Sequence, residues 1–324
     1  MSRQPSRLAW LLRWLSLSTY GLVTSTLFRA DTPPRTMRAR FERFAPSRES
    51  LQQKYPKLRF ESHTLGALHV ESVRALDATR CVVMHLHGGA FVFGSAASYR
   101  NRAMRLSFRF AAEVFVPDYR LAPEHPFPAA LDDALVAYQY VRALRPGVPI
   151  LLSGDSAGGG LVLSLLIRLR ELGTPLPSGA LLLSPWTDLT VSGEPADAQR
   201  SRDRWLTRAH LTRWARYYAG ASDPRTPWMS PLFADLSGLP PLLVLAGADE
   251  ILCAEATRAV ARAQAAGSTA RLLVGRRMQH DWPLTLPWLE ESRDAWQAMC
   301  AFVDERCLAD SRHLPLSSKC SRPS

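Results

Sequence analysis

The sequence predicts an α/β fold in which helices cover both faces of a mostly parallel, doubly wound sheet. Short apolar runs of the kind that form buried parallel strands recur at residues 81–87, 113–117, 149–153, 179–184, 241–246 and 269–274. Helical stretches lie between them at residues 129–144, 158–172 and 253–266, and the last two are followed by a glycine that can end a helix. Strand and helix signals that alternate in this way are typical of a parallel sheet.

Composition is consistent with one large domain and excludes several classes of protein. The chain has 324 residues, of which 47% are hydrophobic, and a formal net charge of +11. Its arginines are spread along the sequence, which is typical of a solvated surface and not of a nucleic-acid-binding arm. Five cysteines without metal-type spacing favour neither a disulfide framework nor a zinc site, and they suggest a reducing, cytoplasmic compartment.

Three segments stand outside the regular alternation. Residues 187–235 are rich in Arg, Trp, Tyr and Pro and have a helical signal near 207–218, so they are predicted to form a cap inserted over the active site. The aromatic residues Trp205, Trp214 and Tyr218 of this segment suit either the core of the cap or ligand contacts. The polar residues 306–324 are predicted to be a disordered tail.

The N-terminal apolar stretch, residues 8–28, raises the question of an anchor. Its leucines at positions 8, 11, 12 and 15 have helical spacing, and Arg13 interrupts the run. This pattern favours an amphipathic helix over a membrane span, and association of this helix with a membrane surface stays open.

The run Gly154-Asp155-Ser156-Ala157-Gly158 follows the strand at 149–153 and precedes a helix. A nucleophilic serine needs such a sharp strand-to-helix turn, because the turn exposes its hydroxyl and the flanking glycines let helix and strand approach closely. The run lacks the glycines of a dinucleotide site and the lysine of a phosphate-binding loop. Ser156 is therefore the predicted nucleophile of a serine hydrolase.

Residues 87–91, with sequence HGGAF, follow the strand at 81–87 and lie upstream of Ser156. This is the position at which such hydrolases place a second loop of oxyanion-binding amides. Backbone N–H groups there, together with that of Ala157, would stabilise the tetrahedral intermediate. His85 and His87 could also suggest a metal site, but no third ligand accompanies them, and no metal is predicted.

A serine nucleophile needs a base and an orienting acid, which follow it in the order Ser, acid, His in this type of fold. Asp249 follows the strand at 241–246, and His280 follows the strand at 269–274. Asp249 and His280 are the predicted acid and base. Glu250 is the alternative acid, and Asp281 is taken as a supporting or surface group.

These motifs resemble the hormone-sensitive-lipase-like family, the bacterial family IV carboxylesterases, over residues 72–303. The matching runs are HGGAF at 87–91, DYRLAPE at 118–124, GDSAGG at 154–159 and SPW at 184–186. The resemblance implies an α/β-hydrolase fold with a helical cap from residues 1–46 and 187–231 and a catalytic domain from 47 to 305. It also implies Ser156, Asp249 and His280 as the triad, and an oxyanion hole built from the amides of Gly89, Ala90 and Ala157, with Gly88 shaping the loop. The family usually has a third glycine where this chain has Ala90.

The predicted activity is hydrolysis of small, short-acyl esters, lactones or acetylated metabolites through an acyl-enzyme, without a cofactor. The run 119–124 has no chemical role of its own and is predicted to hold the loop beside the site. The expected partner is a small ester, not nucleic acid, and a homodimer is possible. Alternatives are a non-catalytic small-molecule receptor of the kind seen in plant gibberellin receptors, and a lipase that docks on lipid through residues 8–28.

Overall fold

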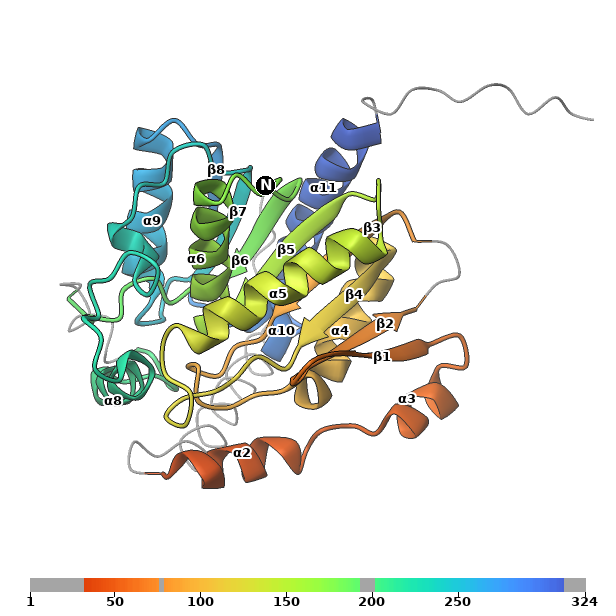
Figure 1. Ribbon diagram of the computed structural model, residues 1–324, viewed down its shortest axis with the longest axis horizontal. Helices are drawn as coiled ribbons and strands as arrows, with labels where there is room; N and C mark the ends of the chain where they lie inside the picture. The colour runs from red at the N-terminus through yellow and green to blue at the C-terminus, as the bar shows by residue number, and fades with distance from the viewer. Residues whose placement is uncertain (1–31, 76–78, 193–201, 312–324) are drawn as a thin grey trace, which may run out of the picture.

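The computed structural model describes residues 32–75, 79–192 and 202–311. Its centre is one eight-stranded sheet in the order β1-β2-β4-β3-β5-β6-β7-β8 (Figure 1). The strands are β1 Arg59–Leu65, β2 Leu68–Arg74, β3 Cys81–Leu86, β4 Ala112–Pro117, β5 Ile150–Asp155, β6 Gly179–Leu183, β7 Leu242–Gly247 and β8 Ala270–Gly275. β2 pairs antiparallel with both β1 and β4, and β3 to β8 pair in parallel. The six predicted strands are confirmed as β3 to β8, and the hairpin of β1 and β2 precedes them.

Helices cover both faces of the sheet, as predicted (Figure 1). α5, α6 and α9 pack on one face, and α4, α10 and α11 pack on the other. The helices are α2 Pro34–Glu42, α3 Arg48–Lys54, α4 Ala96–Phe110, α5 Ala129–Leu144, α6 Ala157–Glu171, α8 Arg208–Ala219, α9 Cys253–Ala265, α10 Trp282–Thr285 and α11 Glu290–Ser311, with a 3-10 turn at Pro231–Phe233.

The central strands separate two hydrophobic cores. In β3, Val82, Met84 and Leu86 face the core under α5 and α6, and Cys81 and Val83 face the core under α4 and α11. Because successive side chains of a strand point to opposite faces, a strand buried on both faces must be apolar throughout. This explains why continuous apolar runs, and not alternating ones, marked the strands in the sequence.

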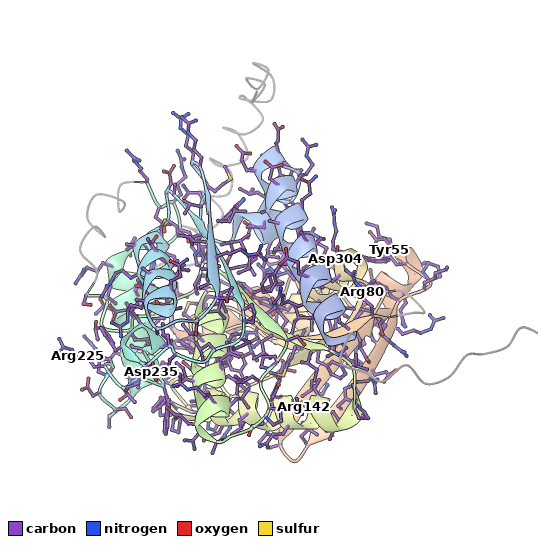
Figure 2. The ribbon with its side chains drawn as sticks, turned by 90° about the horizontal axis from the view of Figure 1, so that it is seen from above. Tyr55, Arg80, Arg142, Arg225, Asp235 and Asp304 are labelled. Carbon is purple, nitrogen blue, oxygen red and sulfur yellow. The ribbon has the colours of Figure 1, made fainter. Side chains whose placement is uncertain are left out.

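The C-terminal helix corrects one predicted boundary. The disordered tail was predicted to begin at residue 306, whereas α11 continues to Ser311. The helix persists because Phe302, Val303 and Cys307 are buried against the sheet. Arg80, just before β3, also forms an ion pair with Asp304 of α11 (Figure 2). Residues 312–324 lie outside the described part.

The cap is described in two pieces, α2 and the segment around α8. The helix predicted near 207–218 is confirmed as α8, whose N-terminus is capped by Thr207. The predicted N-terminal helix at 8–28 and residues 193–201 lie outside the described part. Within the residues that are described, no helix is long and apolar enough to cross a membrane.

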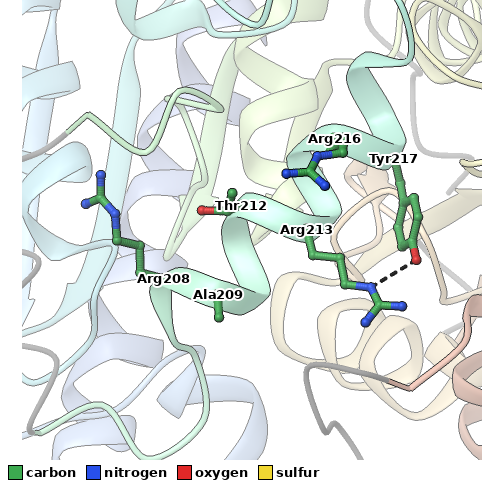
Figure 3. Close-up of a pocket in the computed structure, with 6 residues that line it drawn as sticks. All are labelled: Arg208, Ala209, Thr212, Arg213, Arg216 and Tyr217. Atoms are coloured by element: carbon green, nitrogen blue, oxygen red, sulfur yellow. Dashed lines mark hydrogen bonds between the residues drawn. The ribbon is translucent and has the colours of Figure 1, made fainter.

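The two faces of α8 differ. Leu211, Trp214 and Tyr218 are buried toward the body of the protein. A hollow of about 620 Å³ lies on the other side, lined by Arg208, Ala209, Thr212, Arg213, Arg216 and Tyr217 (Figure 3). All these lining residues belong to α8, so the hollow does not include the loops that bear Ser156 and His280.

Candidate active site

Ser156 occupies the turn between β5 and α6 with a backbone conformation of φ 55° and ψ −124°. A non-glycine residue adopts such a positive φ only under constraint. The constraint comes from both sides, because the Ser156 amide donates to the carbonyl of Leu183 and its carbonyl accepts from the amide of Trp186. A Cβ at Gly158 would overlap the carbonyl of Leu86, so the turn also needs glycine there. Ser156 therefore stands at the N-terminus of α6, where unpaired amides favour negative charge.

The loop after β3 runs past this turn and is also strained. Gly89, Ala90 and Phe91 all have positive φ, at 119°, 55° and 62°. Within the described residues, no hydrogen bond occupies the backbone amides of Gly89, Ala90 and Ala157. These three residues are the predicted oxyanion donors.

Gly88 differs from its neighbours, because its amide is already used inside the protein. The N–H of Gly88 lies 2.9 Å from the hydroxyl of Tyr99 and 3.1 Å from Oδ1 of Asp155. A Cβ at this position would collide with the Asp155 carboxylate. Gly88 thus anchors the loop and offers no donor of its own.

Asp155 is the centre of a buried hydrogen-bond network beneath the loop. Its Oδ1 lies 3.1 Å from Nε2 of His85, and its Oδ2 accepts a 2.6 Å hydrogen bond from Tyr99. Burial opposes ionisation, but the hydrogen bonds and charges from His85, Arg102 and Tyr99 hold the pKa of Asp155 below its usual value. Asp155 directly precedes Ser156. Because the ionised Asp155 accepts from the Gly88 amide, it links the oxyanion loop to the turn that bears Ser156.

Replacing Tyr99 with Phe is expected to weaken the link between the oxyanion loop and Asp155. The change removes the hydroxyl that contacts both Gly88 and Asp155, so kcat is expected to fall roughly tenfold to a hundredfold as the donors lose their alignment. The free energy of unfolding should fall by about 1–3 kcal/mol, because buried polar groups lose a partner. Ester hydrolysis and urea unfolding measure the two effects.

Tyr138→Phe is the matched control for Tyr99→Phe. Its hydroxyl donates to the carbonyl of Pro175, away from the loop, so it should lower stability without lowering kcat. Equal kcat in the two variants would show that the Tyr99 network serves folding alone.

The run 119–124 holds the oxyanion loop, as predicted. The hydroxyl of Tyr119 donates to the carbonyl of His87 at 2.6 Å, and the Tyr119 ring stacks on the His87 ring at 4.2 Å. The amide of Ala122 donates to the carbonyl of Phe91. Arg38 of α2 extends this support, since it donates to the carbonyls of Val92 and Ala122.

His280 lies in the loop after β8, where the sequence places it, but its acidic partner differs from the predicted one. Nδ1 of His280 lies 3.1 Å from Oε2 of Glu250, which is fully buried. Asp249 is partly exposed, and its Oδ1 lies 3.8 Å from Nη1 of Arg202. No hydrogen bond or ion pair joins Asp249 to His280 in the described structure. The prediction that Asp249 orients His280 is therefore wrong in its geometry, and Glu250 takes that place.

The backbone explains why the second carboxylate faces inward. The amide of Asp249 donates to the carbonyl of Met278, and that of Glu250 donates to the carbonyl of Gly247. A Cβ at Gly247 would overlap the Met278 carbonyl, so the loops after β7 and β8 can approach only at glycine. In this tight turn, Glu250 points at His280 and Asp249 points outward toward Arg202.

The charge state of His280 depends on its carboxylate neighbours. Burial alone would lower the pKa of His280, but negative charge on Asp281, Glu250 and Asp203 raises it to about 9. A buried imidazole between carboxylates is stabilised in its charged form. In its neutral form, such an imidazole is a strong base for a proton that a nucleophile gives up.

The cap reaches His280 through residues that the sequence did not single out. The side chain of Gln279 accepts from the amide of Arg204 and donates to the carbonyl of Arg202. Asp203 accepts from the amide of Ile251, next to Glu250. These side chains bind the cap segment to the loops that bear Glu250 and His280. Their role depends on contacts across more than 40 residues of sequence, for which no local pattern exists.

The cap aromatics divide between the two predicted roles. Trp214 and Tyr218 are buried, and Tyr218 stacks on Phe91 of the oxyanion loop with ring centroids 3.7 Å apart. The indole of Trp205 instead meets the ring of His280 edge-on at 5.0 Å. Trp214 and Tyr218 therefore form cap core, and Trp205 is a cap side chain that contacts His280.

The histidine pair before the oxyanion loop takes part in hydrogen bonding. His85 uses one ring nitrogen on Ser153 at 3.1 Å and the other on Asp155. His87 lies 2.8 Å from the carbonyl of Gly88. Over the described ranges, no cluster of three His, Cys, Asp or Glu residues could hold a metal ion.

Comparison with known proteins agrees with the fold. A family model described as alpha/beta hydrolase fold matches residues 83–284. An acetyl-hydrolase of Streptomyces hygroscopicus is 38% identical over 243 residues, which cover 74% of this chain and 81% of that protein.

Two solved structures are similar over nearly their whole length. The esterase EstE5, in a crystal soaked with p-nitrophenyl butyrate, superposes with a TM-score of 0.82 at 31% identity, covering 90% of this chain and 99% of EstE5. An esterase from the bacterial hormone-sensitive lipase family superposes with a TM-score of 0.80 at 32% identity, covering 95% of this chain and all of that one.

Proposed function

Because this chain belongs to the α/β-hydrolase family, among the hormone-sensitive-lipase-like serine carboxylesterases, we propose that Ser156, His280 and Glu250 form its catalytic triad. The observation that carries the proposal is the 3.1 Å contact between Glu250 and Nδ1 of His280. It leaves Nε2 as the nitrogen that can take the proton of the Ser156 hydroxyl. The strained turn that bears Ser156 and the oxyanion loop supply the other requirements of acyl transfer.

The reaction proceeds in two steps. Ser156 attacks the ester carbonyl while its proton passes to Nε2 of His280, and Glu250 holds the Nδ1–H and stabilises the imidazolium. The amides of Gly89, Ala90 and Ala157 bind the oxyanion. The proton then passes to the leaving alcohol. In deacylation, His280 takes a proton from water, the resulting hydroxide attacks the acyl carbon, and His280 returns the proton to Oγ of Ser156 as the bond between the acyl carbon and Oγ breaks and the acid leaves.

The substrate is proposed to be a small ester with a short acyl chain. The Streptomyces relative is named an acetyl-hydrolase, and the EstE5 crystal was soaked with a butyrate ester. In this chain, Trp205 lies against His280, and the cap core covers the oxyanion loop. Both features place cap side chains next to the loops that would hold the reacting carbonyl. A cytoplasmic location, which the cysteine content suggests, is part of the same proposal.

A panel of p-nitrophenyl esters from acetate to palmitate, with lactones and acetylated small molecules, tests this assignment. We expect kcat/KM for acetate and butyrate to exceed that for laurate and longer chains by roughly tenfold or more, because long chains must displace cap contacts. A preference for long-chain emulsions with interfacial activation would contradict the short-acyl assignment and favour a lipid-surface lipase.

A further inference from the structure

His280 has a second buried carboxylate beside it. Oδ2 of Asp281 lies 3.4 Å from Nε2 of His280, on the opposite edge of the ring from Glu250. Both carboxylates and the imidazole are almost completely buried. A catalytic triad requires one acid at Nδ1, so the Asp281 carboxylate at Nε2 is not explained by the proposed mechanism.

The position of Asp281 is held by the backbone. Its φ of 54° is in the left-handed region, and its amide donates to Oγ of Ser184 at 3.0 Å. It directly precedes α10, whose Trp282 and Leu284 are buried in the core. The carboxylate therefore cannot turn to solvent without moving the backbone that carries His280.

We propose that Asp281 is a positioning residue that sets the pH above which His280 acts as a base for Ser156. The inference rests on the proposed function, because it concerns the nitrogen that serves the nucleophile. In the imidazolium form, the Nε2–H of His280 faces the Asp281 carboxylate. The ion pair stabilises the protonated ring, so this proton must leave before Nε2 can accept the proton of Ser156.

The same ion pair acts in the opposite sense during the reaction. Once Ser156 has given its proton to Nε2, His280 is an imidazolium again, and the negative charge of Asp281 stabilises it. Asp281 therefore makes His280 a stronger base, whose Nε2 loses its proton only at higher pH. With a neutral side chain at position 281, His280 would be a weaker base, whose Nε2 loses its proton at lower pH.

Other charged groups face this pair, and none lies as close to Nε2 in the described structure. His280 also faces Glu250 after β7 and Asp203 of the cap. The ionisation of Asp281 depends first on its burial, and then on the charges of His280, Asp155, Glu250 and Arg102. Burial raises the pKa of Tyr99 of α4, and the negative charge of Asp281 raises it further. Burial raises the pKa of Asp281, and the positive charge of His280 opposes that shift. Protonated His280 therefore favours the ionised form of Asp281, which is the form that the ion pair needs.

Asp281→Asn tests the proposal. The amide keeps the shape of the side chain, and Asn tolerates the left-handed backbone. We expect the acidic limb of the pH profile of kcat/KM to move down by about one pH unit or more, with a lower plateau. A purely structural role would lower the plateau and leave the midpoint in place, which would overturn the proposal.

Two further variants keep the test decisive. Asp281→Gly also suits the positive φ and removes the carboxylate, so it should shift the midpoint in the same direction if the Asn variant folds poorly. Asp249→Asn removes a nearby negative charge that does not contact His280, and it should move the midpoint much less. Equal shifts for Asp249→Asn and Asp281→Asn would indicate a general charge effect and contradict the specific ion pair.

A titration that needs no turnover separates this inference from the proposed function. The ring signal of His280 can be followed by NMR in full-length Ser156→Ala protein labelled at histidine, with and without Asp281→Asn. The midpoint is expected to fall by about one unit or more when the carboxylate is removed. An unchanged or higher midpoint would overturn the role of Asp281. Normal ester hydrolysis by Ser156→Ala would instead overturn the triad and leave the titration result standing.

Discussion

Replacing Ser156 with Ala is expected to lower kcat for p-nitrophenyl butyrate by on the order of 10⁴ to 10⁶, the range seen when the nucleophile of a serine triad is removed. The loss follows because no other hydroxyl can form the acyl-enzyme at this turn. The oxyanion amides and the binding surface remain, so a small residual activity above the uncatalysed rate is expected.

The control for this variant is its own folding. Ala and Ser have the same Cβ, so the positive φ at position 156 costs the two residues similar strain. Circular dichroism and the melting temperature should therefore match those of the wild type. Activity within tenfold of the wild type, in a folded Ser156→Ala protein, would exclude Ser156 as the nucleophile.

The second large effect distinguishes the two neighbouring carboxylates. Glu250→Gln is expected to lower kcat by on the order of 10² to 10⁴, because an amide cannot stabilise the imidazolium or fix the Nδ1–H form of His280. Asp249→Asn should stay within about threefold of wild type, since its carboxylate is partly exposed and lies beside Arg202. Steady-state kinetics on the two variants measures both effects. The reverse ranking would return the role of triad acid to Asp249.

The strands that carry the site were predictable because they are buried on both faces. β3 and β5 to β7 consist almost entirely of buried residues, which gives the continuous apolar runs seen in the sequence. The β1–β2 hairpin lacks this signal, because β1 is an edge strand in which exposed and half-buried side chains mix. Its pattern is therefore that of a polar segment, although its pairing with β2 is regular.

The acid of the site shows where sequence reasoning reaches its limit. The order of acid and histidine along the chain locates the loop at residues 249–250, but both positions carry a carboxylate. Which of the two points inward depends on a single turn of backbone, set by hydrogen bonds to Gly247 and Met278. A one-residue difference in orientation has no periodicity to reveal it.

The network under the oxyanion loop was hidden for a different reason. Tyr99 and Asp155 are 56 residues apart and meet only when the sheet forms. The contact between Asp281 and His280 has no sequence signal either, since adjacent residues can point in any direction in a loop. The sequence identified Asp281 only as a neighbour of the base, and the 3.4 Å approach to Nε2 gives it a testable role.

Ser156 is the central residue of the proposed triad, and reaction with a fluorophosphonate probe tests its role as the nucleophile in one measurement. After treatment of the full-length protein, peptide mapping by mass spectrometry should find a single adduct, on the peptide that contains Ser156. An adduct on another residue, or an unmodified Ser156 in active enzyme, would contradict the proposed triad.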